Sequence, residues 1–85
     1  MTWRVAWTEA ALRDLRKLDK TVVARVIQAV ERLAEKEHGN VRRLHGLERE
    51  WRLRVGEWRV RFTYEDQAGE LVVLRVLPRS RAYQR

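Results

Sequence analysis

Arginine side chains at alternate positions of two neighbouring segments are the residues best suited to chemistry in this sequence. Arg52 and Arg54 alternate with Trp51, Leu53 and Val55, and after a short break Arg59 and Arg61 alternate with Trp58, Val60 and Phe62. Successive side chains of a strand point to opposite faces, so the four guanidinium groups would share one face and the apolar side chains the other. Guanidinium groups bind phosphate oxygens bidentately, and this face therefore suits a polyanion.

The C-terminal segment adds further candidates. Arg79 follows the most apolar stretch of the chain, where its side chain can reach a cleft, and Arg81 and Tyr83 come next. Tyr83 could stack on a base, transfer a proton or simply pack against the fold. No acidic residue follows Glu70, so the end of the chain is entirely basic.

A purely structural interpretation of the arginine face stays open. Charged strand faces are common, and Glu48, Glu50 or Glu57 could neutralise the arginines. Against this, like charges directly opposite each other on a sheet are destabilising. A sequence that keeps them in place gives up stability, which is typical of a functional surface.

Length and charge limit the number of domains and the kind of partner that this protein can have. The 85 residues suffice for one domain spanning 1–85, and 19 Lys and Arg against 12 Asp and Glu give a net charge of +7. Residues 42–85 carry eleven of the basic side chains, all Arg, against six acids. Such a charge suggests nucleic acid or an acidic protein as partner.

Several classes are not expected. The chain has no cysteine, which fits a reducing cytoplasm, and it has neither a signal-peptide pattern nor an apolar run long enough to cross a membrane. His38 and His45 form no metal-ligand spacing, and Glu65 and Asp66 are too few for a metal nuclease. We therefore expect no metal, no cofactor and no membrane contact.

The hydrophobic pattern predicts the elements that would position the arginines. Residues 2–7 alternate as a strand, Thr8 suits a helix N-cap, and a second helix would run from Asp19 to a stop near Gly39. Three strands follow, with turns at 56–57 and 66–69, and the apolar stretch 71–77 is expected in the interior of the sheet. The predicted fold is α+β in the order β-α-α-β-β-β, with an N-terminal strand and a helical hairpin packed on one face of an antiparallel sheet.

Several segments together resemble RelE-type toxins of the RelE/ParE toxin–antitoxin superfamily. These are Trp3 with the first strand, the stretch from Ala11 to Lys20, Leu44-His45-Gly46-Leu47, the stretch Trp51-Arg52-Leu53-Arg54-Val55-Gly56-Glu57-Trp58-Arg59-Val60, and the closing R-x-x-x-Y of residues 79–83. The resemblance covers essentially the whole chain, and the segment from Trp51 to Val60 is its most specific part.

The resemblance implies an mRNA interferase: a ribosome-dependent endoribonuclease that works in the A site without a metal or cofactor. In such toxins the 2′-hydroxyl attacks the adjacent phosphodiester. The matching positions imply catalytic roles for Arg52, Arg54, Arg59, Arg79 and Tyr83. RNA or ribosome contacts are expected from four other arginines: Arg61, Arg81, Arg42 and Arg43. The implied partners are mRNA, the 70S ribosome and a RelB-like antitoxin.

One departure from the family bears on mechanism. Some relatives carry Lys at the positions of Arg52 and Arg54, and Lys can lose its proton near neutrality whereas Arg cannot. Arg52 or Tyr83 remain the candidates for proton transfer, since no histidine near the C-terminus supplies a Glu/His pair. Surrounding guanidinium groups could lower the pKa of Tyr83.

Two other functions stay open at this point. A ParE-like toxin would share the fold and poison DNA gyrase by protein contact, without nuclease activity. A basic adaptor would bind RNA or a protein through phosphate-type contacts alone, with a strong dependence on salt.

Overall fold

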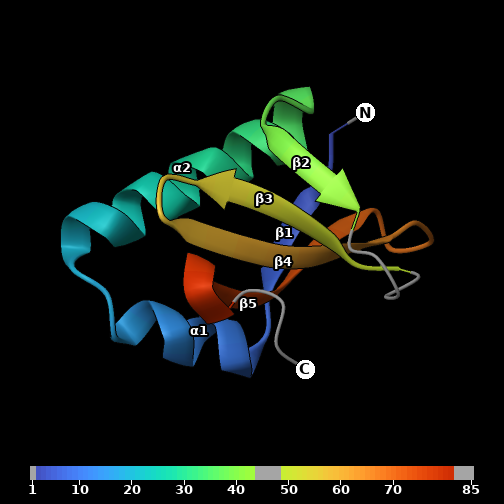
Figure 1. The fold of residues 1–85 in the computed structure, drawn as a ribbon. Coiled ribbons are helices and arrows are strands. Elements are labelled where there is room, and N and C mark those ends of the chain that lie inside the picture. Colours follow the sequence, from blue (N-terminus) through green and yellow to red (C-terminus); the bar gives the residue numbers. More distant parts are fainter. Residues whose placement is uncertain (1, 44–48, 82–85) are drawn as a thin grey trace.

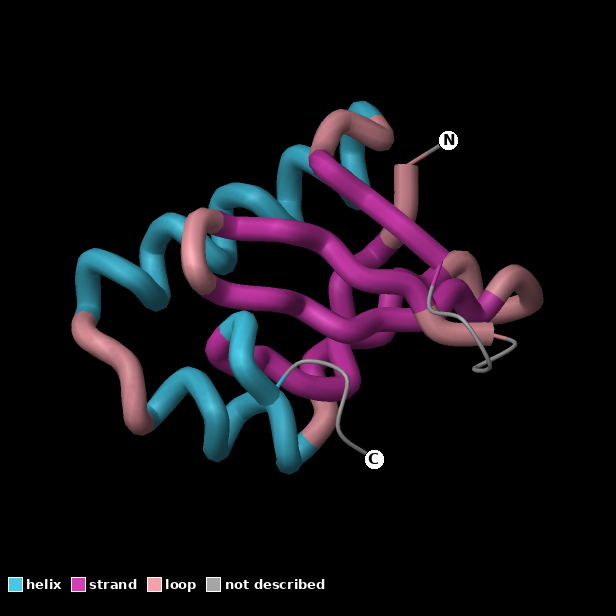
Figure 2. Tube along the Cα trace, in the orientation of Figure 1, coloured by secondary structure: helices cyan, strands magenta, loops and turns pink. Residues whose placement is uncertain are grey.

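The computed structural model describes residues 2–43 and 49–81, which form one five-stranded sheet and two helices (Figures 1 and 2). In chain order the elements are β1 (Arg4–Trp7), α1 (Glu9–Arg16), α2 (Lys20–Lys36), β2 (Asn40–Arg43), β3 (Trp51–Val55), β4 (Trp58–Glu65), β5 (Glu70–Pro78) and the short 3₁₀ helix η1 (Arg79–Arg81). The predicted α+β class, with an N-terminal strand and two helices before the remaining strands, is confirmed. No helix in these two ranges is long and apolar enough to cross a membrane.

The sheet differs from the sequence prediction in two respects. Its strand order is β1-β5-β4-β3-β2, and β1 pairs with β5 in parallel, so the sheet is mixed rather than wholly antiparallel. The second difference is β2, which pairs antiparallel with β3 and was not predicted. Only Val41 breaks the polar run of this four-residue strand, too little to give a period of two. β5 lies between β1 and β4, and its interior position is confirmed.

The helix boundaries follow the local signals in part. Thr8 caps α1 as predicted, because its hydroxyl accepts a hydrogen bond of 3.1 Å from the backbone N–H of Ala11. Asp19 occupies the N-cap position of α2, but its side chain makes no capping hydrogen bond. The helix was expected to stop near Gly39; it ends at Lys36, and Glu37, rather than the glycine, adopts the left-handed conformation of the cap, at φ 57°.

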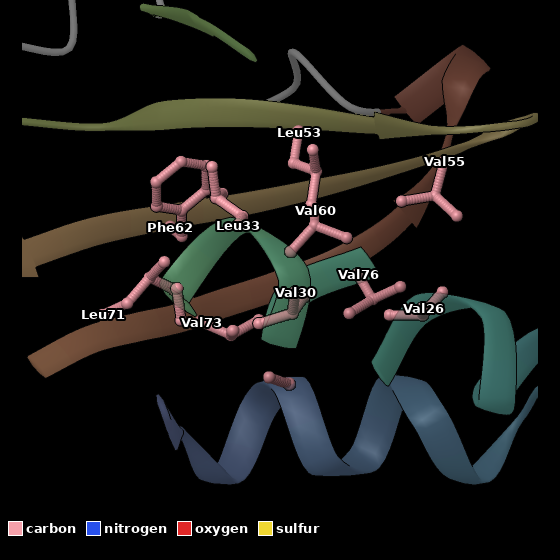
Figure 3. Packing of buried hydrophobic residues seen from close by; sticks show 12 residues of the cluster. Val26, Val30, Leu33, Leu53, Val55, Val60, Phe62, Leu71, Val73 and Val76 are labelled. Atoms are coloured by element: carbon pink, nitrogen blue, oxygen red, sulfur yellow. The ribbon is translucent and has the colours of Figure 1, made fainter. Parts of the chain in front are cut away.

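The core lies between the sheet and the two helices (Figure 3). Strands β3, β4 and β5 contribute Leu53, Val60, Phe62 and Leu71, all 0–1% exposed, and α2 supplies Val26, Val30 and Leu33 from successive turns. Burying side chains of this size contributes about 1.5–3 kcal/mol each, which fixes the orientation of the sheet. The arginines that alternate with these core residues in β3 and β4 therefore lie on the opposite face of the sheet.

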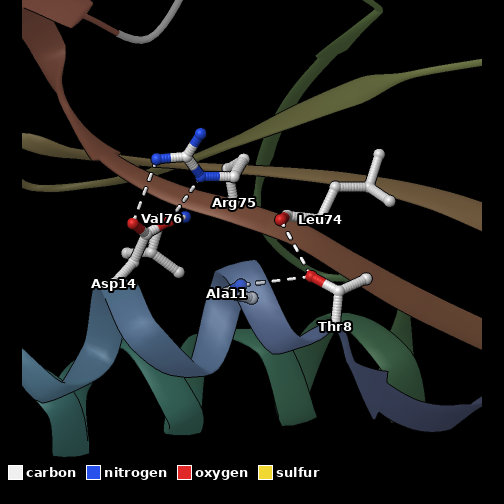
Figure 4. A network of polar contacts seen from close by, with 6 residues as sticks. All are labelled: Thr8, Ala11, Asp14, Leu74, Arg75 and Val76. Atoms are coloured by element: carbon white, nitrogen blue, oxygen red, sulfur yellow. Dashed lines mark hydrogen bonds and ion pairs between the residues drawn. The ribbon is translucent and has the colours of Figure 1, made fainter.

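Beyond the end of β1, residues of helix α1 and its N-cap form hydrogen bonds with the exposed backbone edge of β5 (Figure 4). The Thr8 hydroxyl donates to the carbonyl of Leu74 at 3.0 Å, and the Asp14 carboxylate accepts the backbone N–H of Val76 at 2.9 Å. The same carboxylate accepts two hydrogen bonds from Arg75, at 2.8 and 3.1 Å. These contacts hold the C-terminal half of β5, from which Arg79 emerges.

Asp14 is almost fully buried in this contact, at 6% exposure. Burial alone would raise the pKa of the carboxyl group, but the hydrogen bonds from Arg75 and Val76 and the charges of Arg75 and Lys17 outweigh it. The net effect lowers the pKa of Asp14 below its ordinary value. The carboxylate is therefore ionised whenever the protein is folded near neutral pH.

Candidate active site

Two rows of polar side chains cross the face of the sheet opposite the core. The first row joins Asn40 of β2, Arg54 of β3 and Arg59 of β4, which are directly opposite one another in the strand register. The second row joins Arg42, Arg52 and Arg61 in the same way. The register therefore agrees with the expectation that the arginines of β3 and β4 share one face.

A pocket of about 340 Å³ lies over these rows, and its described lining is Asn40, Arg42, Arg52, Arg54, Arg59 and Arg79. The sequence had predicted four of these arginines as a catalytic group and Arg42 as an RNA contact. Asn40 was missed, because the strand that carries it was not predicted. The strand has one apolar residue in four, so the local sequence holds no periodic signal that could have found it.

Arg59 is a buried member of the pocket lining, and the adjacent turn holds its side chain. Its side chain is 4% exposed, and its Nη1 donates to the carbonyls of Gly56 at 2.7 Å and Trp58 at 3.0 Å. Both carbonyls belong to the tight turn between β3 and β4, where Gly56 has φ 58°. These two backbone carbonyls orient the guanidinium group, so the turn helps to hold this arginine in place.

Arg79 reaches the same pocket from the end of β5. Pro78 ends that strand, and the backbone N–H of Arg79 donates to the carbonyl of Glu57 at 2.9 Å. This hydrogen bond joins the start of η1 to the β3–β4 turn, although the two segments are more than twenty residues apart in sequence. The contact explains how a residue beyond the sheet comes to lie beside Arg54 and Arg59.

The electrostatics of the pocket favour an anion. Within residues 2–43 and 49–81, none of the side chains that line it is acidic. Arg52 and Arg59 are 8% and 4% exposed, while Arg42, Arg54 and Arg79 are exposed. Partly desolvated cations interact more strongly with a bound anion than cations in open water, so the arrangement suits a phosphate group.

Three of the other predicted arginines lie outside this pocket. Arg61 shares its face but makes two hydrogen bonds, of 2.9 and 3.0 Å, to the Glu50 carboxylate, so the structural interpretation of the charged face holds at this position. Arg43 lies over the ring of Trp51, at 5.7 Å from the centroid. Arg81 lines a smaller pocket, of about 190 Å³, between α1 and the end of β5.

Some positions used in the sequence analysis fall outside the described residues. Tyr83, a candidate for proton transfer, lies there, as does the whole Leu44–Leu47 motif with His45; Glu48, a possible partner of the arginines, lies there too. In the part of the chain that the structure describes, no three His, Cys, Asp or Glu side chains group as metal ligands.

Comparison with protein families identifies the chain. The family described as ParE toxin of type II toxin–antitoxin system, parDE, matches residues 5–83. The chain belongs to this toxin family. No curated protein sequence matches it closely enough to add to this assignment.

Solved structures extend the relation to RelE toxins. The archaeal RelE–RelB complex of Pyrococcus horikoshii matches with a TM-score of 0.77 and 26% identity, over 96% of this chain and 100% of that one. The toxin–antitoxin complex RelBE2 of Mycobacterium tuberculosis matches with 0.80 and 27%, over 93% and 100%. A free RelE mutant of E. coli, at 0.74 and 23% over 89% and 82%, shares the fold. The toxin is thus a type II member of the RelE/ParE superfamily, as the sequence resemblance implied.

Proposed function

We propose that the toxin is a metal-independent endoribonuclease that cleaves mRNA in the ribosomal A site by attack of the 2′-hydroxyl. The observation that carries the proposal is the pocket lined by Arg52, Arg54, Arg59 and Arg79, which come from β3, β4 and the start of η1. Similarity to RelE toxins at 26% and 27% identity over nearly the whole chain supports the same assignment.

Phosphodiester cleavage of this kind builds negative charge on the non-bridging phosphate oxygens. Fixed cations aimed at that charge stabilise the transition state without having to reorganise. Arg59, clamped by two carbonyls, and Arg79, tied to the β3–β4 turn, would hold the scissile phosphate, with Arg54 at the phosphate or the leaving oxygen. Removing one such donor typically costs about 100- to 1000-fold in rate.

Proton transfer needs a group other than these arginines. Guanidinium groups do not lose a proton at physiological pH, so Arg52 would act as a cation and not as a base. Tyr83 is the proposed group for moving the proton of the 2′-hydroxyl. If Tyr83 has no such role, positioning and charge stabilisation would carry the reaction.

An antitoxin of RelB type is the proposed protein partner. Among the structurally similar proteins, those from P. horikoshii, M. tuberculosis and Methanococcus jannaschii are toxin–antitoxin complexes. mRNA and the 70S ribosome are the proposed targets, which would place the action of the single domain, residues 1–85, in the cytoplasm. Arg61, Arg81, Arg42 and Arg43 are proposed to contact RNA or the ribosome around the pocket.

Primer extension on mRNA from cells that express the toxin tests the proposal. We expect cuts within reading frames that disappear when translation initiation is blocked and that Arg59→Lys weakens strongly, since Lys cannot reproduce the two carbonyl contacts and still present a fork of donors. Intact mRNA in cells whose growth the toxin arrests would overturn the nuclease assignment.

A ParE-like activity is the second candidate, and the family match to residues 5–83 favours it. Such a toxin would inhibit DNA gyrase by protein contact and leave mRNA whole. Supercoiling of relaxed plasmid by purified gyrase distinguishes the two: we expect no inhibition by this toxin at concentrations that abolish translation in an extract. Failed supercoiling with intact mRNA would establish the second candidate.

A further inference from the structure

Asn40 is the one pocket residue, among the described lining, that is neither charged nor restricted to donating hydrogen bonds. Its neighbours in the pocket are arginines, whose side chains have donors only. Phosphate oxygens are acceptors and are matched by those arginines. The ribose 2′-hydroxyl differs from phosphate because it also has a proton to donate, and an arginine cannot accept it.

The backbone leaves Asn40 on the pocket face. Gly39 has φ 154°, and a Cβ at that position would lie 2.7 Å from Cδ1 of Leu53, so the chain passes close against the core just before β2. Asn40 then pairs with Arg54, in the row that continues to Arg59. Its side chain is exposed, which leaves the amide oxygen accessible to a bound molecule.

We propose that the Asn40 side-chain carbonyl accepts a hydrogen bond from a ribose 2′-hydroxyl and so makes the pocket selective for RNA over DNA. This inference rests on the proposed function, in which the arginines hold the adjacent phosphate. The amide is not basic, so Asn40 orients the hydroxyl and does not take its proton away. An amide beside five cations also adds no negative charge that would repel the phosphate.

The test measures binding by the free toxin, without ribosomes, to two short single-stranded oligonucleotides of identical sequence. One carries ribose and the other 2′-fluoro sugars, which keep a ribose-like pucker but have no 2′ donor. Fluorescence anisotropy gives both dissociation constants. We expect wild-type toxin to bind the ribose strand about fivefold more tightly, the value of one net hydrogen bond.

Three variants separate the contact from general electrostatics. Asn40→Ala should bring the ratio of the two dissociation constants to about one while leaving the affinity for the 2′-fluoro strand unchanged. Asn40→Asp keeps an acceptor, so it should preserve the ratio but weaken both complexes through repulsion of phosphate. Gln28→Ala removes an exposed amide from α2 and should change neither affinity.

The outcomes also separate this inference from the proposed function. A wild-type ratio of one, or an unchanged ratio in Asn40→Ala, would overturn the assignment of Asn40 alone. Arg54→Ala should weaken both strands equally, since it removes a phosphate contact. If Arg54→Ala and Arg59→Ala leave both affinities unchanged, the pocket does not bind RNA, and the proposed function fails with it.

Discussion

Arg59 and Arg61 lie two residues apart on the same strand and face, yet the fold treats them in different ways. Arg59 donates to two backbone carbonyls of the β3–β4 turn, whereas Arg61 makes a bidentate contact with the Glu50 carboxylate. Arg75 on β5 resembles Arg61, because Asp14 holds it. A backbone carbonyl orients a guanidinium group without adding a negative charge, whereas a carboxylate places a full negative charge beside it. Arg59 lines the pocket and Arg61 does not, so the position and contacts of each arginine, rather than its residue type, distinguish the two.

The largest effect is expected on the rate of mRNA cleavage when an arginine of the pocket is removed. Arg79→Ala should lower the rate of mRNA cleavage on programmed ribosomes by about 100-fold or more, because one transition-state cation is lost. The side chain is exposed, so the urea midpoint of unfolding should stay near the wild-type value. Arg32→Ala, which removes an exposed arginine from α2, is the matched control and should cleave normally. Equal rates for the two variants would remove Arg79 from the site.

A smaller effect, on stability, is expected where a carboxylate holds the arginine. Asp14→Ala should lower the free energy of unfolding by about 2–3 kcal/mol, because the buried N–H of Val76 loses its acceptor along with the charged partner of Arg75. Arg75→Ala should cost about 1 kcal/mol or less, since this arginine is 44% exposed and the Val76 contact survives. Urea titration measures both. The reverse order would show that the ion pair, and not the strand edge, is the stabilising element.

The same carboxylate gives a smaller dependence on pH. Since the pKa of Asp14 is lowered in the folded protein, its contribution is complete above the unfolded value, about 4, and is lost as the pH falls through the folded pKa. The difference in free energy of unfolding between wild type and Asp14→Ala should therefore be constant near neutrality and shrink below about pH 4. A difference that grows in acid would contradict the direction of the shift.

The smallest effect is expected on RNA affinity when the carboxylate that pairs with Arg61 is removed. Glu50→Gln keeps the shape of the side chain but removes the negative charge beside Arg61. We expect affinity for single-stranded RNA to rise about twofold at low salt, with a slope of log affinity against log salt steeper by about 0.7. Arg54→Ala should make that slope shallower by a similar amount. An unchanged slope in Glu50→Gln would mean that Arg61 does not lie near bound RNA.

Much of the fold could be predicted because its signals are local. The alternation of Trp51 to Phe62, the N-cap at Thr8 and the turns at 56–57 and 66–69 each depend on a few consecutive residues. β2 could not be predicted in the same way, since one apolar residue in four gives no period and its stability comes from pairing with β3. The parallel pairing of β1 with β5 is likewise a property of the whole domain.

The candidate site could likewise be predicted only where its signals are local. By itself the sequence determined that Arg52, Arg54, Arg59 and Arg61 share one face, because a period of two in a strand with a buried side leaves the other residues no choice of face. Only the tertiary structure decided that Asn40 lines the same pocket and that Glu50 forms an ion pair with Arg61. It also decided that a backbone hydrogen bond to Glu57 brings Arg79 to the pocket. Those three outcomes depend on which segments meet after folding, and neighbouring residues in the chain carry no record of such distant contacts.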